Sequence, residues 1–289
     1  MGEKPNVQNY CACFIDLLGQ RNALAGQSII PNFASEQEKA DFLKIVNDTV
    51  GAIEQLQVRA QDFIQGKADA YSIRKYLSSE EQELYDEMGK VGAKQQRWSD
   101  GLVYYSSLNN EMAKCPMRAV LQIFMLSGTF CFLGLANKHP IRGAIETAWG
   151  VELHENELYG AIVANSYDLE SKVAQYPRIV VGDKTMNYLD VHLELPPNNI
   201  DKLALYNRDC AVLCKDMTTI DQDGYHIVDY LGTTFTKSVT SSTNQELFGL
   251  AYRYIDEQYS LHRNNKDTKL ALRYAWLREY FHKNKHLHS

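Results

Sequence analysis

The stretch Cys11-Ala12-Cys13-Phe14-Ile15-Asp16-Leu17-Leu18-Gly19 is an apolar segment that carries one carboxylate and ends at a glycine. This pattern is typical of a buried strand, which we place at residues 10–18. A carboxylate at the exit of such a strand is costly to bury unless it is paired or binds a cation, so Asp16 is a candidate metal ligand. The alternative is that Asp16 caps a helix beginning near Leu17, because aspartate is a good N-cap residue.

The composition suits one large globular domain, or a domain with an extension. The chain has 289 residues, of which 45% are hydrophobic, and a net charge of −6. This negative charge argues against a nucleic-acid partner, which would need a basic face. The N-terminus does not resemble a signal peptide. The longest apolar run, residues 119–136, is interrupted by polar residues and glycines, so we expect a buried helix, no membrane partner and a cytoplasmic protein.

The six cysteines, at positions 11, 13, 115, 131, 210 and 214, do not have the spacing of a zinc site. We therefore expect ordinary buried thiols in a reducing compartment.

Strand and helix patterns alternate to about residue 231, which predicts an α+β or α/β domain around one sheet. Gly143 lies inside a predicted strand and indicates a close backbone approach. The C-terminal helices carry an aromatic stripe typical of core packing, and we expect their His/Lys tail to be solvated and frayed. The predicted elements are a helical region at 35–85, a hairpin at 94–107, a helix at 111–136, strands at 141–150 and 177–181, a helix at 162–175, a hairpin at 212–231 and helices at 244–286.

Asp100 is the second candidate carboxylate. Asp100-Gly101 lies between two strand-like segments, and Asp-Gly is the strongest short hairpin signal, so the turn alone could explain this aspartate. A hairpin tip is nevertheless a stiff place for a ligand.

Several motifs follow one another along the chain: Phe14-Ile15-Asp16-Leu17-Leu18-Gly19, Ser99-Asp100-Gly101, Ile141-Arg142-Gly143-Ala144-Ile145, Leu158-Tyr159-Gly160, Tyr167-Asp168-Leu169-Glu170-Ser171 and Tyr176-Pro177-Arg178-Ile179-Val180-Val181. In this order they resemble the catalytic domain of class III nucleotidyl cyclases. The best match within that family is the compact bacterial branch that makes cyclic pyrimidine nucleotides in anti-phage (Pycsar) defence. The resemblance implies an α+β, cyclase-like sheet flanked by helices, with a catalytic domain at 8–231 and a helical extension at 232–289 packed on it.

In this family two aspartates hold two divalent ions, Mg²⁺ or Mn²⁺, and they match the catalytic candidates Asp16 and Asp100. A carbonyl after the first aspartate usually contacts a metal, which here is Leu17. The backbone N–H groups of the helix that opens at Leu18, Gly19, Gln20 and Arg21 would hold phosphates. The nucleotide contacts that the resemblance implies are Phe14, Leu18, Gly19, Gln96, Arg97, Arg142 and Arg178.

The chain departs from the family at the transition-state pair. Adenylyl and guanylyl relatives use an Asn and an Arg four residues apart, where this chain has Ala164 and Asp168. Asn165 is one residue off, and Arg142 or Arg178 could supply the positive charge. The alternative is that each arginine forms a structural ion pair at a strand end.

The purine-selecting pair also differs. Gln96 stands where the relatives have Lys or Glu, and the second base contact aligns near Glu157. Glutamine can donate or accept a hydrogen bond and does not impose a purine. This fits a pyrimidine cyclase, with UTP as first choice and CTP as second, but it also fits a decayed cyclase.

Class III active sites form between two subunits, so the resemblance implies a homodimer. It also implies that the product is a messenger for a separate effector protein. The aromatic C-terminal stripe and the predicted hairpin are candidate dimer surfaces, although core packing explains the stripe equally well. The competing hypothesis is an inert nucleotide-binding or dimerisation module.

Overall fold

The computed structural model describes residues 6–18, 30–66, 73–90, 92–98, 101–109, 117–154, 156–196, 201–239 and 244–288. The strands are β1 (Val7–Leu17), β2 (Lys94–Trp98), β3 (Gly101–Ser107), β4 (Ile141–His154), β5 (Glu157–Tyr159), β6 (Ile179–Val181), β7 (Thr218–Ile220) and β8 (His226–Val228). The helices are α2 (Glu36–Gly66), α3 (Ser79–Lys90), α4 (Met117–Ala136), α5 (Ala161–Asp168), α6 (Asp183–Leu193), α7 (Lys202–Asp216), α8 (Thr233–Val239), α9 (Asn244–Asn264) and α10 (Thr268–Asn284). A π-helical turn (Leu169–Val173) continues α5.

Within the described residues, one mixed sheet of eight strands organises the molecule, in the order β2-β3-β1-β4-β6-β8-β7 with β5 paired to β4. Strand β1 is central and runs antiparallel to both β3 and β4. The order β2-β3-β1-β4, with helices linking β1 to β2 and β3 to β4, is a split βαβ arrangement of the ferredoxin-like type. The prediction of an α+β domain around one helix-flanked sheet is confirmed.

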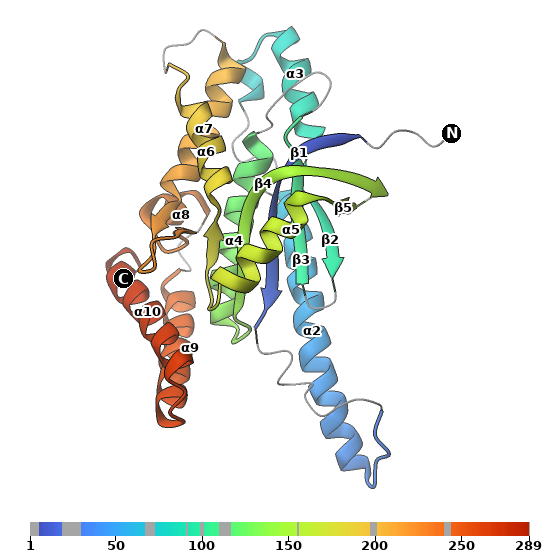
Figure 1. Cartoon of the computed structure of the whole chain (residues 1–289), viewed down its shortest axis with the longest axis vertical. Coiled ribbons are helices and arrows are strands. Elements are labelled where there is room, and N and C mark those ends of the chain that lie inside the picture. The colour runs from blue at the N-terminus through green and yellow to red at the C-terminus, as the bar shows by residue number, and fades with distance from the viewer. Residues whose placement is uncertain are drawn as a thin grey trace.

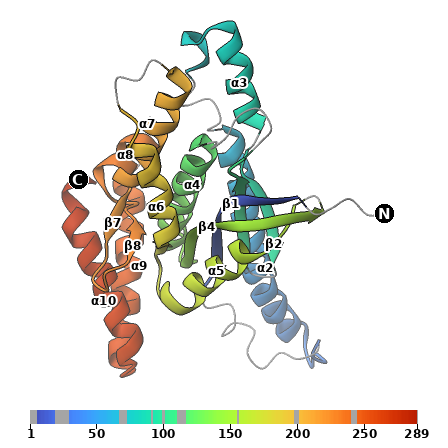
Figure 2. The same cartoon turned by 45° about the horizontal axis from the view of Figure 1, so that its top comes forward.

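Alternate residues of β1 enter two different hydrophobic clusters, as the period of two in a strand requires. Cys11, Cys13 and Ile15 pack in the main cluster with α4, whereas Ala12 and Phe14 pack with α5. Figures 1 and 2 show α4 and α5 on opposite sides of the sheet. Asp16 therefore belongs to the α5 face.

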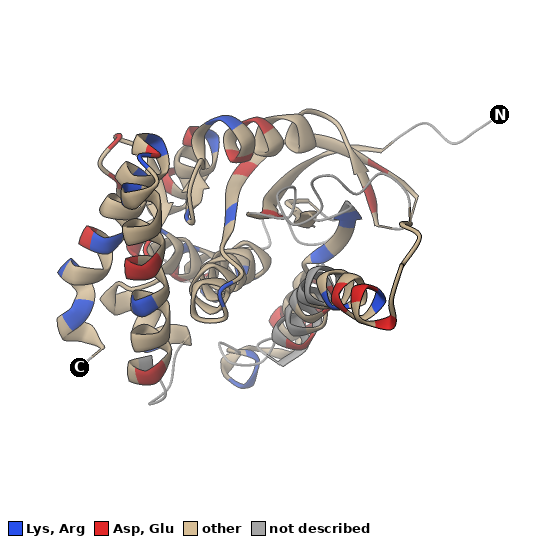
Figure 3. Cartoon of the chain, turned by 90° about the horizontal axis from the view of Figure 1, so that it is seen from below, with Lys and Arg blue, Asp and Glu red and all other residues tan. Residues whose placement is uncertain are grey.

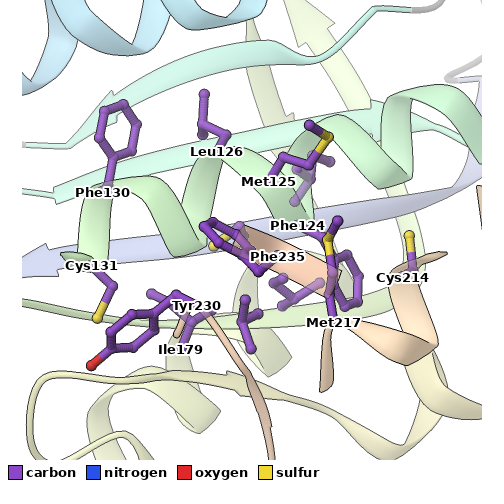
Figure 4. Packing of buried hydrophobic residues seen from close by; sticks show 14 of the residues in the cluster. Phe124, Met125, Leu126, Phe130, Cys131, Ile179, Cys214, Met217, Tyr230 and Phe235 are labelled. Carbon is purple, nitrogen blue, oxygen red and sulfur yellow. The ribbon is translucent and has the colours of Figure 1, made fainter. Parts of the chain in front are cut away.

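Helix α4 is the core helix of the larger face. It is apolar and long enough to cross a membrane, but 72% of its most apolar window is buried inside the protein. Figure 4 shows Phe124 and Cys131 of α4 directed toward Tyr230 and Phe235. The prediction that residues 119–136 form a buried helix is confirmed, and residues 110–116 lie outside the described part of the chain.

Strand β4 curves across the α5 face, so that its C-terminal end and β5 approach β2 (Figure 1). The ammonium of Lys94 lies 2.7 Å from the carboxylate of Glu152. Near its start, β4 approaches β1 closely, because a Cβ atom at Gly143 would lie 2.6 Å from the carbonyl oxygen of Phe14. The close backbone approach predicted at Gly143 is confirmed.

Two predictions of local structure are wrong. Residues 212–216 belong to helix α7 and not to a hairpin, because Cys210 and Cys214 are one helical turn apart and both are buried. The hairpin itself is formed by β7 and β8. The C-terminal tail is also not frayed, because it is packed on the protein up to His288. The ring of His288 stacks on that of Phe248 with centroids 4.9 Å apart, and its Nε2 lies 3.1 Å from the carbonyl oxygen of Leu231.

Five cysteines within the described ranges, Cys11, Cys13, Cys131, Cys210 and Cys214, are free and buried, as predicted. Figure 3 shows both acidic and basic residues on the helices near the C-terminus.

Candidate functional site

Asp16 lies at the end of the central strand, where three strands meet. Its Cα is paired with Gly101 of β3 on one side and with Arg142 of β4 on the other. The side chain of Asp16 remains 22% exposed. Because side chains alternate along β1, Asp16 lies on the same face of the sheet as Phe14, at the point where the apolar run ends.

The guanidinium of Arg142 links Asp16 to a second carboxylate. Its terminal nitrogen Nη2 donates to Asp16 Oδ2 at 3.1 Å. Its Nε lies 2.5 Å from Glu170 Oε1. Glu170 is only 1% exposed, and it lies in the π-helical turn that follows α5. Such turns recur at functional sites, because they change which side chains a helix presents.

The second expected metal ligand, Asp100, lies outside the described residues, as do Gly19, Gln20 and Arg21. Gly101, which follows Asp100 in the sequence, is the register partner of Asp16. The predicted pairing of the segments at 94–107 is confirmed by the antiparallel ladder between β2 and β3.

The residues around Asp16 that were expected to touch nucleotide are largely engaged by the protein itself. Phe14 is 5% exposed and packs edge-on against Tyr167 with ring centroids 5.5 Å apart. Leu17 is buried, and the backbone N–H of Leu18 donates to the Pro140 carbonyl at 2.9 Å. The Leu18 amide therefore already has a partner, and its predicted role toward phosphate stays a prediction.

Gln96 and Glu157, the two positions related to base selection, are brought together. The side-chain oxygen of Gln96 accepts a hydrogen bond from the backbone N–H of Leu158 at 2.9 Å, which ties β2 to β5. Glu157 is the residue before Leu158, and Arg97 follows Gln96 with an exposed side chain. These residues are far apart in sequence and meet because β4 curves over the face.

Arg178 is buried in a network of its own. It is 2% exposed and pairs with Asp221 at 2.7 Å and Asp223 at 2.6 Å. It also lies over the ring of Tyr176, 4.4 Å from the centroid. Although burial raises the pKa of Asp223, the hydrogen bond and positive charge of Arg178 lower it overall. The structure thus provides the ion pair that was the alternative to nucleotide binding at this arginine.

The positions aligned with the missing transition-state pair lie on the solvent side of α5. Ala164 is exposed. Asp168 pairs with Lys172 one turn later, at 2.8 Å, and its side chain is 57% exposed.

A divalent cation fits Asp16 by donor chemistry. Among the described residues there is no group of three or more His, Cys, Asp and Glu side chains able to hold a metal. Mg²⁺ does not require such a cage, because it usually binds one or two carboxylates together with waters and substrate phosphates. One partly exposed carboxylate at a strand end meets this requirement, and Arg142 occupies one of its oxygens.

Glu170 is the member of this ion-paired cluster that sequence reasoning missed. It lies within the quoted motif Tyr167–Ser171 but received no role. The sequence contained a signal for it. Glu170 comes one helical turn after Ser166, so it lies on the same buried side of the helix. A carboxylate in an apolar stripe predicts a buried cationic partner.

A separate cavity of about 220 Å³ lies between the β7–β8 hairpin and α10. Burial raises the pKa of Asp229 in its wall, and the Tyr280 hydroxyl donates to this carboxylate at 2.7 Å. The predicted site residues do not line this cavity.

Comparisons with known proteins add little at the level of sequence. No family model matches the chain. The search of curated proteins found no match. One solved structure that aligns is the non-canonical dimeric guanylyl cyclase domain of the RhoGC fusion protein from the aquatic fungus Blastocladiella emersonii, at 8% identity and a TM-score of 0.36, covering 69% of this chain and 94% of that chain. A likeness at this level carries no argument, so the fold is defined here by its own strand order and register.

Proposed function

We propose that this protein is a nucleotidyl cyclase that converts a pyrimidine nucleoside triphosphate into its 3′,5′-cyclic monophosphate and pyrophosphate. UTP is the preferred substrate and CTP the alternative. One observation carries the proposal. The register places Asp16, at the end of the central strand, opposite Gly101, the residue that follows Asp100. The resemblance assigns metal binding to these two aspartates.

In this reaction the ribose 3′-oxygen attacks the α-phosphorus, the bond to pyrophosphate breaks and the hydroxyl proton leaves to solvent. Asp16, Asp100 and the Leu17 carbonyl would hold two Mn²⁺ or Mg²⁺ ions. When bound, these ions supply a lowered hydroxyl pKa and neutralise the triphosphate. Among the protein's own residues, Arg142 supplies positive charge beside Asp16.

Base selection is assigned to the region of Gln96. Its amide accepts from the Leu158 backbone, so its NH₂ group is the part of the side chain left to donate toward a pyrimidine carbonyl. Uracil and cytosine both present such an oxygen, which is why both substrates are retained.

A homodimer belongs to the proposal. The aromatic C-terminal stripe is used in the protein's own core, since Phe248, Tyr274 and Phe281 are buried. A different surface supports association, the adjoining ends of β1, β4 and β5. Its exposed apolar residues are Val7 (59%), Trp149 (52%), Leu153 (54%) and Tyr159 (47%). The cyclic product would act as an anti-phage messenger on a separate effector.

The second candidate is an inert module with the same fold. Two observations favour it: the side chains of Ala164 and Asp168 cannot stabilise a transition state, and Asp16 is engaged by Arg142.

The test is incubation of the purified protein with Mn²⁺ and ATP, GTP, CTP or UTP separately, with products identified by mass. We expect one cyclic pyrimidine nucleotide, lost in Asp16→Asn and Asp100→Asn and retained in the surface control Asp168→Asn. A folded protein that gives no product from any triphosphate would favour the inert module. Cyclic AMP or cyclic GMP would contradict the assignment of base specificity.

A further inference from the structure

Glu170 is a buried carboxylate whose position needs an explanation. It is 1% exposed and lies in the π-helical turn Leu169–Val173, on the side of the helix that faces the sheet. A carboxylate at such a place is costly unless a cation is fixed beside it. Arg142 of β4 provides that cation, with its Nε 2.5 Å from Glu170 Oε1.

The two ion pairs of Arg142 are unequal. The pair with Glu170 is short, and the Glu170 side chain is 2% exposed. The pair with Asp16 is longer, at 3.1 Å, and the Asp16 side chain is 22% exposed. Glu170 is therefore the anchor of the guanidinium, and Asp16 is its outward-facing partner.

Arginine transmits orientation because its guanidinium is planar and its donors have fixed directions. With its Nε side in an ion pair with Glu170, the planar guanidinium lies so that its terminal nitrogen Nη2 donates to Asp16. The links are Glu170 to Arg142 and Arg142 to Asp16, and they join the π-helical turn, β4 and β1.

We infer that Glu170 is a positioning residue that acts through Arg142 to orient Asp16 for a divalent cation. This inference rests on the metal site of the proposed function and goes beyond it, because it adds the outer partners, that is, the residues that hold the metal-binding carboxylate without touching the metal. Outer partners of this kind typically contribute about 10–100-fold to metal affinity.

The experiment measures Mn²⁺ binding to the full-length protein, without nucleotide, by the electron paramagnetic resonance signal of free Mn²⁺. Loss of binding in Asp16→Asn locates the ion. Glu170→Gln keeps the shape and removes the anchoring charge, and we expect its Mn²⁺ affinity to fall about 10-fold. Asp168→Asn is the matched control, because it removes a charge two residues away that pairs with Lys172 at the surface, and its affinity should not change.

Arg142→Lys provides an independent variant that keeps the charge near Glu170 but cannot bridge both carboxylates. We expect a similar loss of affinity, and no further loss in the double variant, because both changes break the same link. Circular dichroism confirms that each variant is folded.

Wild-type affinity in Glu170→Gln and Arg142→Lys would overturn the positioning role and leave the metal site intact. Mn²⁺ binding that does not depend on Asp16 would instead overturn the metal site of the proposed function, and the positioning role with it.

Discussion

At the scale of single residues, Arg178 illustrates a buried charge that the chain neutralises internally. Its guanidinium contacts two carboxylates of the β7–β8 turn, Asp221 and Asp223, and donates to the Val173 carbonyl at 2.8 Å. Removing one partner of such a network leaves uncompensated buried charge, which is more damaging than replacing the whole network.

We therefore expect Arg178→Met to lower the free energy of unfolding by about 3–5 kcal/mol, measured by urea denaturation. Arg74→Met is the matched control, because the Arg74–Asp86 pair is exposed, with side chains 51% and 46% accessible. That control should change stability little. Equal effects in the two variants would show that the Arg178 network is not structural.

Glu146 gives a pH-dependent prediction. It is 6% exposed, and burial raises its pKa above the ordinary value of 4.5, although hydrogen bonds from Thr147 and Thr185 oppose the rise. A raised folded-state pKa means that the contribution of Glu146 to stability is complete below about pH 4.5 and is lost as the pH rises through the folded-state pKa.

Glu146→Gln does not titrate and retains an acceptor oxygen. Its unfolding free energy relative to wild type should therefore rise as the pH is raised above about 4.5, as followed by urea denaturation at several pH values. A constant difference across this range would contradict the assignment.

At the scale of elements, α4 is held against α8 at Gly128. A Cβ atom there would lie 2.4 Å from Phe235 Cε2 and 3.0 Å from Val228 Cγ1, so a larger residue must displace a buried ring. Close packing makes such insertions costly even though alanine is the better helix former.

We expect Gly128→Ala to destabilise the protein by about 1–3 kcal/mol, measured by thermal and chemical unfolding. Gly249→Ala in α9 is the matched change, because its new methyl would meet nothing closer than Arg253 Nη1 at 3.9 Å. This control should gain up to about 1 kcal/mol from helix propensity. A gain in both variants would show that α4 and α8 separate freely.

At the scale of the whole molecule, one hydrophobic cluster joins parts of the chain that are distant in sequence. Cys13 of β1, Cys214 of α7 and Phe281 of α10 all belong to it. The C-terminal helices thus contribute to the same core as the sheet, and the division into residues 8–231 and 232–289 stays a prediction. Helix α2, in contrast, projects from the body, and its Leu43 and Val58 are 46% and 53% exposed (Figure 1).

The sequence alone determined the elements whose signals are local. The apolar run at residues 10–18, the pairing of the two strands around Asp100-Gly101 and the helix at 119–136 were predictable because each depends on nearby side chains. Asp16 was recognisable as a candidate for the same reason, since a carboxylate that ends an apolar strand differs from its neighbours. The prediction failed at 212–216, where burial of Cys210 and Cys214 against the rest of the core favours a helix.

Only the tertiary structure decided what surrounds Asp16. Gly101, Arg142 and Glu170 are separated from it by 85, 126 and 154 positions in the sequence, and no local pattern specifies which charges meet. The strand register brings Arg142 beside Asp16, and the π-helical turn brings Glu170 beside Arg142. The physical reason is that ion pairing depends on distance in space, which the packing of the sheet and helices sets.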